Sequence, residues 1–173
     1  MGNITIKRVA IDALFLCVLI ISSLISFPLG SIPVTLQVFG VFLIILILRF
    51  DSIIVFLVYM LMGSLGLPVF AGGTSGIMLP TYGFLIGFLI STIVLNIFNK
   101  YSKIKKEYLK FIIEAVMFML ITYIFGLPYC MVALKMSFSS AILYFLPFIG
   151  IDIVKIIIVF LIYKRIKNVI YFE

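Results

Sequence analysis

Two charged residues in an apolar stretch near the end of the chain are the first candidates for chemistry. Asp152 and Lys155 are three residues apart, so on a helix their side chains lie on the same face. Ionised groups that face lipid are costly, and such a pair is expected to point into the protein. The two can form an ion pair with each other, and they can also meet a polar ligand. The sequence leaves both interpretations open at this point.

The uncharged, glycine-rich stretch from Gly66 to Pro80 is a second candidate. It joins two apolar runs with more residues than a turn requires, and irregular backbone near a bilayer persists only where protein or a cavity satisfies its polar groups. Gly72 and Gly73 allow positive φ and a close approach of the backbone to a bound molecule. A flexible apolar turn is the alternative for any single glycine. Tyr82 opens the next run, directly beside this stretch.

The elements that must position these residues are apolar runs of about the length of membrane helices. The chain has 173 residues, of which 65% are hydrophobic and 11% charged, so lipid is the solvent that suits its surface. At about 20 residues per span, this length predicts an all-α, polytopic membrane protein of six transmembrane helices in a single domain over residues 1–173. The expected spans are 9–27, 36–48, 53–65, 82–98, 111–125 and a last one that starts between 147 and 152 and ends at 163, with a short interfacial helix at 137–146.

The cations predict which ends of the helices face the cytoplasm. When alternate loops are placed on the cytoplasmic side, eleven of the thirteen Lys and Arg residues fall there, and Lys135 and Lys155 are the exceptions. Both termini are then cytoplasmic, and the loops 28–35 and 66–80 are external. This distribution accounts for the net charge of +7 without nucleic acid as a partner.

The sequence lacks residues that many enzymes and cofactor sites need. It has no histidine and no phosphate-binding Gly-x-x-x-x-Gly-Lys-Ser/Thr loop, and Cys17 and Cys130 have no metal-ligand spacing. We therefore expect no catalytic residue, no metal and no cofactor, and any use of ATP would need partner proteins. Asp12 and Glu114, near the cytoplasmic ends of two helices, are interpreted as structural. The first apolar run is expected to be a retained helix rather than a signal peptide.

Three stretches of the sequence, which include residues already named, resemble a known family. They are Pro33-Val-Thr-Leu-Gln37, then Gly63 to Gly73 with Pro80 to Phe88, and finally Pro147-Phe-Ile-Gly-Ile-Asp-Ile-Val-Lys155. Their order and spacing, from the first loop to the last helix, resemble the BioY family, the biotin-specific S components of energy-coupling factor (ECF) transporters. Two details depart from the family. Tyr82-Gly83-Phe84 follows the Pro-Thr pair where two glycines and a tyrosine are usual, and Gly150-Ile-Asp152 stands where Pro-Gly-Asp is common.

The resemblance implies an S-component fold and a substrate-capture subunit in the bacterial cell membrane. Its partners would be biotin, the lipid bilayer, a transmembrane coupling subunit and two ATPase subunits. Asp152 would accept hydrogen bonds from the ureido N–H groups of biotin, and Lys155 would donate to the ureido carbonyl or, in the reverse pose, to the carboxylate. The other implied substrate-binding residues, which would form a lid and neutral hydrogen bonds, are Thr35, Gln37, Gly72, Gly73, Thr81 and Tyr82.

Other interpretations exist for several of these residues. Helix capping is the alternative for Thr35 and Thr81, and interfacial anchoring is the alternative for Tyr82. The family docks on its coupling subunit through small residues of the first helix. Here Ala10, Ala13 and Cys17 supply that pattern only partly.

Three other functions are weighed against biotin capture. The chain could be an S component for another vitamin, such as riboflavin or thiamin. A membrane-embedded lipid enzyme with Asp152 as general base is a weaker hypothesis, because such chemistry generally requires a second acid, a metal or a nucleophile. A non-catalytic assembly protein would leave the charged pair and the glycine-rich stretch without a ligand.

Overall fold

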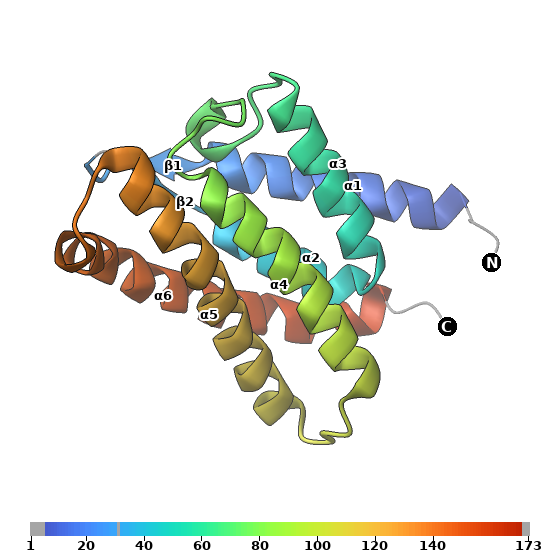
Figure 1. Ribbon diagram of the computed structural model, residues 1–173. Helices are drawn as coiled ribbons and strands as arrows, with labels where there is room; N and C mark the ends of the chain where they lie inside the picture. Colours follow the sequence, from blue (N-terminus) through green and yellow to red (C-terminus); the bar gives the residue numbers. More distant parts are fainter. Residues whose placement is uncertain (1–5, 31, 171–173) are drawn as a thin grey trace.

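The computed structural model describes residues 6–30 and 32–170, with the side chains described as far as residue 167. The described residues are mostly helical, which confirms the main part of the all-α prediction (Figure 1). Loop residues add one antiparallel pair of two-residue strands and a single 3₁₀ turn. In chain order the elements are α1 (Ile6–Leu24), β1 (Ser26–Phe27), β2 (Val34–Thr35), α2 (Gln37–Leu48), α3 (Asp51–Ser64), η1 (Ala71–Gly73), α4 (Tyr82–Tyr101), α5 (Glu107–Leu134) and α6 (Phe138–Ile170).

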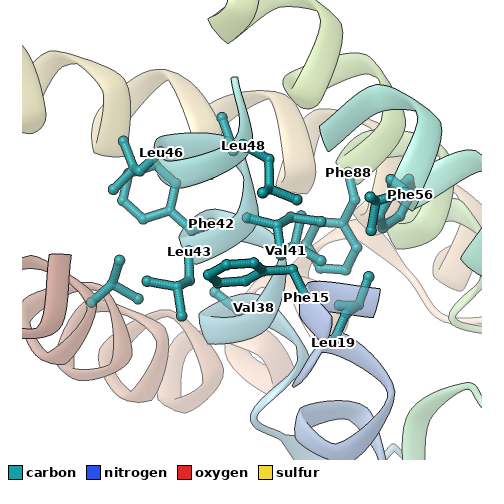
Figure 2. Close-up of a cluster of buried hydrophobic side chains, with 14 of the residues drawn as sticks. Phe15, Leu19, Val38, Val41, Phe42, Leu43, Leu46, Leu48, Phe56 and Phe88 are labelled. Carbon is teal, nitrogen blue, oxygen red and sulfur yellow. The ribbon is translucent and has the colours of Figure 1, made fainter. Parts of the chain in front are cut away.

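Helix α2 lies at the centre of the bundle. All of its 12 residues except Phe39 are buried, as expected for a helix that carries no charge and is apolar on every face. Figure 2 shows Phe15 of α1, Phe56 of α3 and Phe88 of α4 around it. At 1.5 Å per residue, α2 is about 18 Å long. It is therefore shorter than the hydrocarbon core of a bilayer, which is about 30 Å thick.

Three of the described helices, α4, α5 and α6, are long and apolar enough to cross a membrane. Their outer faces are also apolar. On α5, for example, the side chains of Ile112, Val116, Leu120 and Ile124 recur every four residues, and each is more than half exposed. An exposed apolar stripe of this length is unfavourable in water and favourable in lipid. The chain is therefore a membrane protein.

Two predicted helix boundaries are wrong. The fifth span was expected to end at residue 125, but α5 continues through Gly126 and Pro128 to Leu134. The segment 137–146 is not a separate interfacial helix, because α6 begins at Phe138 and includes Pro147. Proline is tolerated inside membrane helices where neighbouring groups satisfy the freed backbone. The first turns of α6 point in a different direction from the rest of the helix (Figure 1).

Helices α4 and α5 pack closely because glycines line their interface. A Cβ atom added at Gly87 would lie 2.9 Å from the backbone of Thr122, and one at Gly83 would lie 2.9 Å from the carbonyl oxygen of Phe125. On the other side, Gly126 makes room for the ring of Phe84. Small residues at such positions let two membrane helices approach one another. This contact holds Phe84 of α4 beside Tyr123 of α5, and Phe88 of α4 beside Phe118 of α5.

Candidate functional site

A cavity lies where α2 begins, between the loop that precedes it and α4, α5 and α6. The space between its walls, together with the open mouth, is about 470 Å³. Most of its wall is apolar or aromatic, and a few polar groups face one another across it. The lining residues are Ile32, Pro33, Val34, Thr35, Gln37, Val38, Ala71, Thr81, Phe84, Phe88, Tyr123, Phe145, Phe148, Asp152 and Lys155.

Asp152 and Lys155 form the charged part of the cavity wall. They lie one turn apart on α6, and the Lys155 ammonium donates to Asp152 Oδ1 over 2.6 Å. The two side chains are only 7% and 6% exposed, respectively. The hydroxyl of Tyr123 on α5 donates to the other oxygen, Asp152 Oδ2, over 2.9 Å. Both carboxylate oxygens are thus engaged, while each keeps a further lone pair for a ligand.

Thr35 and Gln37 reach the cavity from the start of α2. The Thr35 hydroxyl accepts a hydrogen bond from the Gln37 backbone N–H over 3.3 Å, as in a turn that leads into a helix. The Gln37 side chain donates from Nε2 to the Tyr59 hydroxyl over 2.8 Å. Its position is therefore fixed by α3, which does not itself line the cavity.

Five of the eight predicted substrate-binding residues line this cavity: Asp152, Lys155, Thr35, Gln37 and Thr81. Thr81 stands at the N-cap position of α4, yet its hydroxyl makes no capping hydrogen bond. Capping therefore does not account for this threonine.

The other three predicted residues lie beside the cavity rather than in its wall. Gly72 has φ +66° in η1, and a Cβ atom there would lie 3.1 Å from Ser26 Oγ of β1. The Gly73 amide donates to the carbonyl of Phe70 over 2.9 Å. The Tyr82 hydroxyl is 3.0 Å from Ser64 Oγ. A role for Gly72, Gly73 and Tyr82 in ligand binding stays a prediction.

Several lining residues were not predicted, although a signal for some of them exists. Phe145 and Phe148 precede Asp152 by seven and four residues, which places them on the same face of α6. That spacing could have identified them. Tyr123 lies on another helix, and its contact with Asp152 depends on how α5 packs. Phe84, Phe88 and Ala71 are ordinary apolar residues in the sequence, which offers no signal for them.

The predicted docking residues and the two acids interpreted as structural lie away from the cavity lining. Ala10, Ala13 and Cys17 are exposed on α1. Asp12, also on α1, is half-buried, whereas Glu114 on α5 is buried with Lys110 at 3.9 Å. The docking role of the small residues stays a prediction.

The cavity can hold a small, mainly apolar molecule that carries both N–H donors and a carbonyl acceptor. The aromatic walls favour burial of rings, Asp152 accepts hydrogen bonds and Lys155 donates them. No group of three or more His, Cys, Asp or Glu residues that could hold a metal ion occurs in the part of the chain that the structure describes. The arrangement is that of a binding site.

Comparisons with known proteins give a consistent result. The family model described as “BioY family” matches residues 1–171. A biotin transporter BioY of Thermotoga maritima is 31% identical over 163 residues, which are 90% of this chain and 92% of that protein. A probable biotin transporter BioY of Pyrococcus horikoshii is 36% identical over 170 residues, 94% of this chain and 97% of that protein.

One solved structure is similar over nearly the whole chain. It is described as the S-component for biotin from an ECF-type ABC transporter. The match covers 96% of this chain and 95% of that one. The TM-score is 0.84 at 22% sequence identity. This likeness shows that the two chains share a fold.

Proposed function

The chain belongs to the BioY family, and on that premise we propose that it is the biotin-binding S component of an ECF-type importer. It is a transporter component rather than an enzyme. The observation that carries the proposal is the buried Asp152–Lys155 pair in the wall of an aromatic cavity. A buried pair of this kind is costly to maintain for stability alone.

The chemical groups of biotin match the residues that line the cavity. Its bicyclic ring system is mainly apolar, and each Å² of apolar surface removed from water contributes about 25 cal/mol. Phe84, Phe88, Phe145 and Phe148 supply aromatic surface for that contact. The ureido group carries two N–H donors and one carbonyl acceptor, which Asp152 and Lys155 complement.

The charge balance of the pair favours one of the two poses left open by the sequence. Asp152 and Lys155 neutralise each other at 2.6 Å. A biotin carboxylate placed beside them would give this buried site a net negative charge, which is unfavourable at low dielectric. The ureido group is neutral and adds no charge. We therefore place the ureido group at Asp152 and Lys155 and the carboxylate away from them.

We also propose a topology for the bundle: six transmembrane helices in a single domain, in the bacterial cell membrane, with both termini cytoplasmic. The start of α1 and the end of α6 lie toward one end of the molecule, and the β1–β2 pair lies toward the other (Figure 1). Most cations precede or follow helices at the first end, as the positive-inside rule requires. The cavity would then open to the outside.

Transport would depend on other chains. The proposed partners are a transmembrane coupling subunit and two ATPase subunits, and this chain would supply solute recognition. The exposed small residues Ala10, Ala13 and Cys17 on α1 are the proposed contact with the coupling subunit. Small side chains let a partner helix approach the backbone closely.

Direct binding to the purified chain tests the proposal. Isothermal titration in detergent is expected to show that biotin binds, that riboflavin and thiamin do not, and that ATP changes nothing. Biotinamide, which lacks the carboxylate charge, is expected to bind nearly as well as biotin if the ureido group meets the pair. Binding of riboflavin or thiamin instead of biotin would overturn the choice of solute. Absence of binding by every vitamin in the panel would overturn the proposed function.

A further inference from the structure

A chain of hydrogen bonds runs from the cavity wall into the protein behind it. Gln37 Nε2 donates to the Tyr59 hydroxyl over 2.8 Å, and that hydroxyl donates to the carbonyl oxygen of Val69 over 3.0 Å. The Ser23 hydroxyl of α1 lies 2.6 Å from the same Val69 oxygen and 2.8 Å from the carbonyl oxygen of Ile20, and its one proton can be donated to either. Gln37, Tyr59 and Ser23 are all buried. Of these residues, only Gln37 lines the cavity in the part of the chain that the structure describes.

The direction of this chain is set by its last member. A carbonyl oxygen accepts hydrogen bonds and cannot donate them, so the Tyr59 hydroxyl directs its proton to Val69. The same hydroxyl oxygen is then free to accept, and the group on Gln37 that can donate to it is the amide nitrogen. If the amide were reversed, its oxygen would need the Tyr59 proton and would take it from Val69. The observed orientation satisfies Gln37 and Tyr59 together.

We propose that Tyr59 is a positioning residue. It fixes the Gln37 side-chain amide so that the amide oxygen, rather than the amide nitrogen, faces the cavity. Gln37 Oε1 and Asp152 then provide two acceptors in one cavity, and Lys155 provides the donor. This pattern complements a cyclic urea with two N–H groups and one carbonyl. The inference deepens the proposed function and rests on it for the identity of the solute. The orientation of the amide can be measured without any solute.

The surroundings of Tyr59 allow its hydroxyl to be removed with little change in packing. Its ring is fully buried and lies 5.7 Å from the ring of Phe56 and 5.4 Å from that of Phe70, measured between centroids. Phenylalanine keeps these ring contacts. The Val69 carbonyl can still accept the proton of the Ser23 hydroxyl. In Tyr59→Phe, the Gln37 amide nitrogen therefore loses its partner while the loop keeps an anchor.

The orientation can be observed directly because Gln37 is the only glutamine in the sequence. Labelling with side-chain ¹⁵N-glutamine gives one pair of amide proton signals by NMR in detergent micelles. In the unmodified protein one proton is expected at the shift of a hydrogen-bonded amide, with slow exchange with water. Tyr59→Phe is expected to move that signal toward the free-amide value and to speed exchange. Ser23→Ala should leave the signal in place. An unchanged signal in Tyr59→Phe would overturn the inference.

Binding measurements test whether the orientation matters for recognition. One hydrogen bond contributes about 1 kcal/mol, so Tyr59→Phe should weaken biotin binding about fivefold to tenfold. In a Gln37→Leu variant, adding Tyr59→Phe should lower biotin affinity almost no further, because Tyr59 affects binding through Gln37. Tyr129→Phe is the matched control. It removes a tyrosine hydroxyl that donates to a carbonyl of the same loop, that of Ile77, over 3.2 Å, and biotin affinity should stay within about twofold.

Failure of the role proposed for Tyr59 and failure of biotin binding give different results. An equal loss from Tyr59→Phe with and without Gln37 would show that the tyrosine acts through the fold, and it would overturn the inference. A loss of the same size in Ser23→Ala would assign the effect to Val69 and would also overturn it. If the unmodified protein binds no biotin, the proposed function fails, and the NMR signal of Gln37 still decides the orientation.

Discussion

Ion pairs at the two ends of the bundle differ in how far they are buried. Asp152 and Lys155, in the cavity wall, are 7% and 6% exposed and belong to one helix. At the other end, Arg8 pairs with Asp51 between α1 and α3, and Lys167 pairs with Glu107 between α6 and α5. In each of these pairs one side chain is about half exposed: Arg8 at 53% and Glu107 at 47%. A third pair at that end, Lys110 with Glu114, has a buried acid, but its charges are 3.9 Å apart and the Lys110 side chain is 22% exposed. An exposed pair is inexpensive and contributes little, whereas a buried pair needs another reason to be present.

Burial of both partners and the nature of their surroundings, more than the presence of opposite charges, therefore distinguish a binding pair from a structural one. The exposed pairs join the ends of neighbouring helices. The hollow that Arg8 and Asp51 border is lined by no aromatic residue among those that the structure describes. Tyr123 supports Asp152 from a second helix, which orients the carboxylate toward the cavity. The two ends should therefore respond very differently to the loss of one charge.

The largest expected effect comes from Lys155→Met. This change keeps most of the side-chain length and leaves the Asp152 carboxylate buried without its cation. Loss of one partner of a buried, hydrogen-bonded charge pair at a binding surface costs about 3 kcal/mol of binding, so biotin affinity should fall about a hundredfold. Isothermal titration measures the loss. Lys164→Met, at an exposed position about two and a half turns further along α6, is the control and should bind normally. If Lys155→Met and Lys164→Met bound biotin equally well, the buried pair would have no role in binding.

A smaller effect is expected from Tyr123→Phe. It removes the hydrogen bond to Asp152 Oδ2 and leaves the pair with Lys155 intact. A hydrogen bond to a charged group contributes about 1.5 kcal/mol or more, so affinity should fall about tenfold. Tyr108→Phe, at an exposed tyrosine near the start of the same helix, is the control. If Tyr123→Phe bound biotin normally, the carboxylate would be oriented by Lys155 alone.

The smallest effect is expected from Asp51→Asn at the opposite end of the bundle. It breaks the pair with the largely exposed Arg8. The unfolding free energy should fall by no more than about 1 kcal/mol, and biotin affinity should not change. Thermal unfolding in detergent and titration of the same sample measure both quantities. A large loss of biotin affinity here would mean that the two ends are coupled and that the comparison fails.

Much of the helical framework could be predicted from the sequence, because apolar runs and charged ends report directly on the membrane. The runs expected at 36–48 and 53–65 correspond closely to α2 and α3. The errors occurred where proline or glycine was read as the end of a helix. Around Pro128 and Pro147 the helix continues. Local propensity ends a helix in water, but a membrane environment favours closed backbone hydrogen bonds and overrides it.

Part of the candidate site could be predicted because its charged residues share one helix. The spacing of Asp152 and Lys155 implies a common face, and the structure brings them to 2.6 Å. Tyr123 and Tyr59 could not be predicted in the same way, since each acts across a contact between helices. For Gly72 and Gly73 the sequence predicts the local backbone conformation but not the position relative to the cavity. Their positive φ angles occur as expected, but the fold of the loop directs them beside the cavity rather than into its wall.

The enclosure of α2 also has a consequence for the order in which the chain assembles during synthesis. Residues 37–48 leave the ribosome before α3, α4 and α5, whereas α6, which packs against α2, leaves it after them. Contacts between segments so far apart in sequence form slowly. Until α6 has been made, the apolar helix α2 lacks one of the walls that enclose it. The insertion machinery or the earlier helices must shelter it, and the binding site cannot form before α6 is in place.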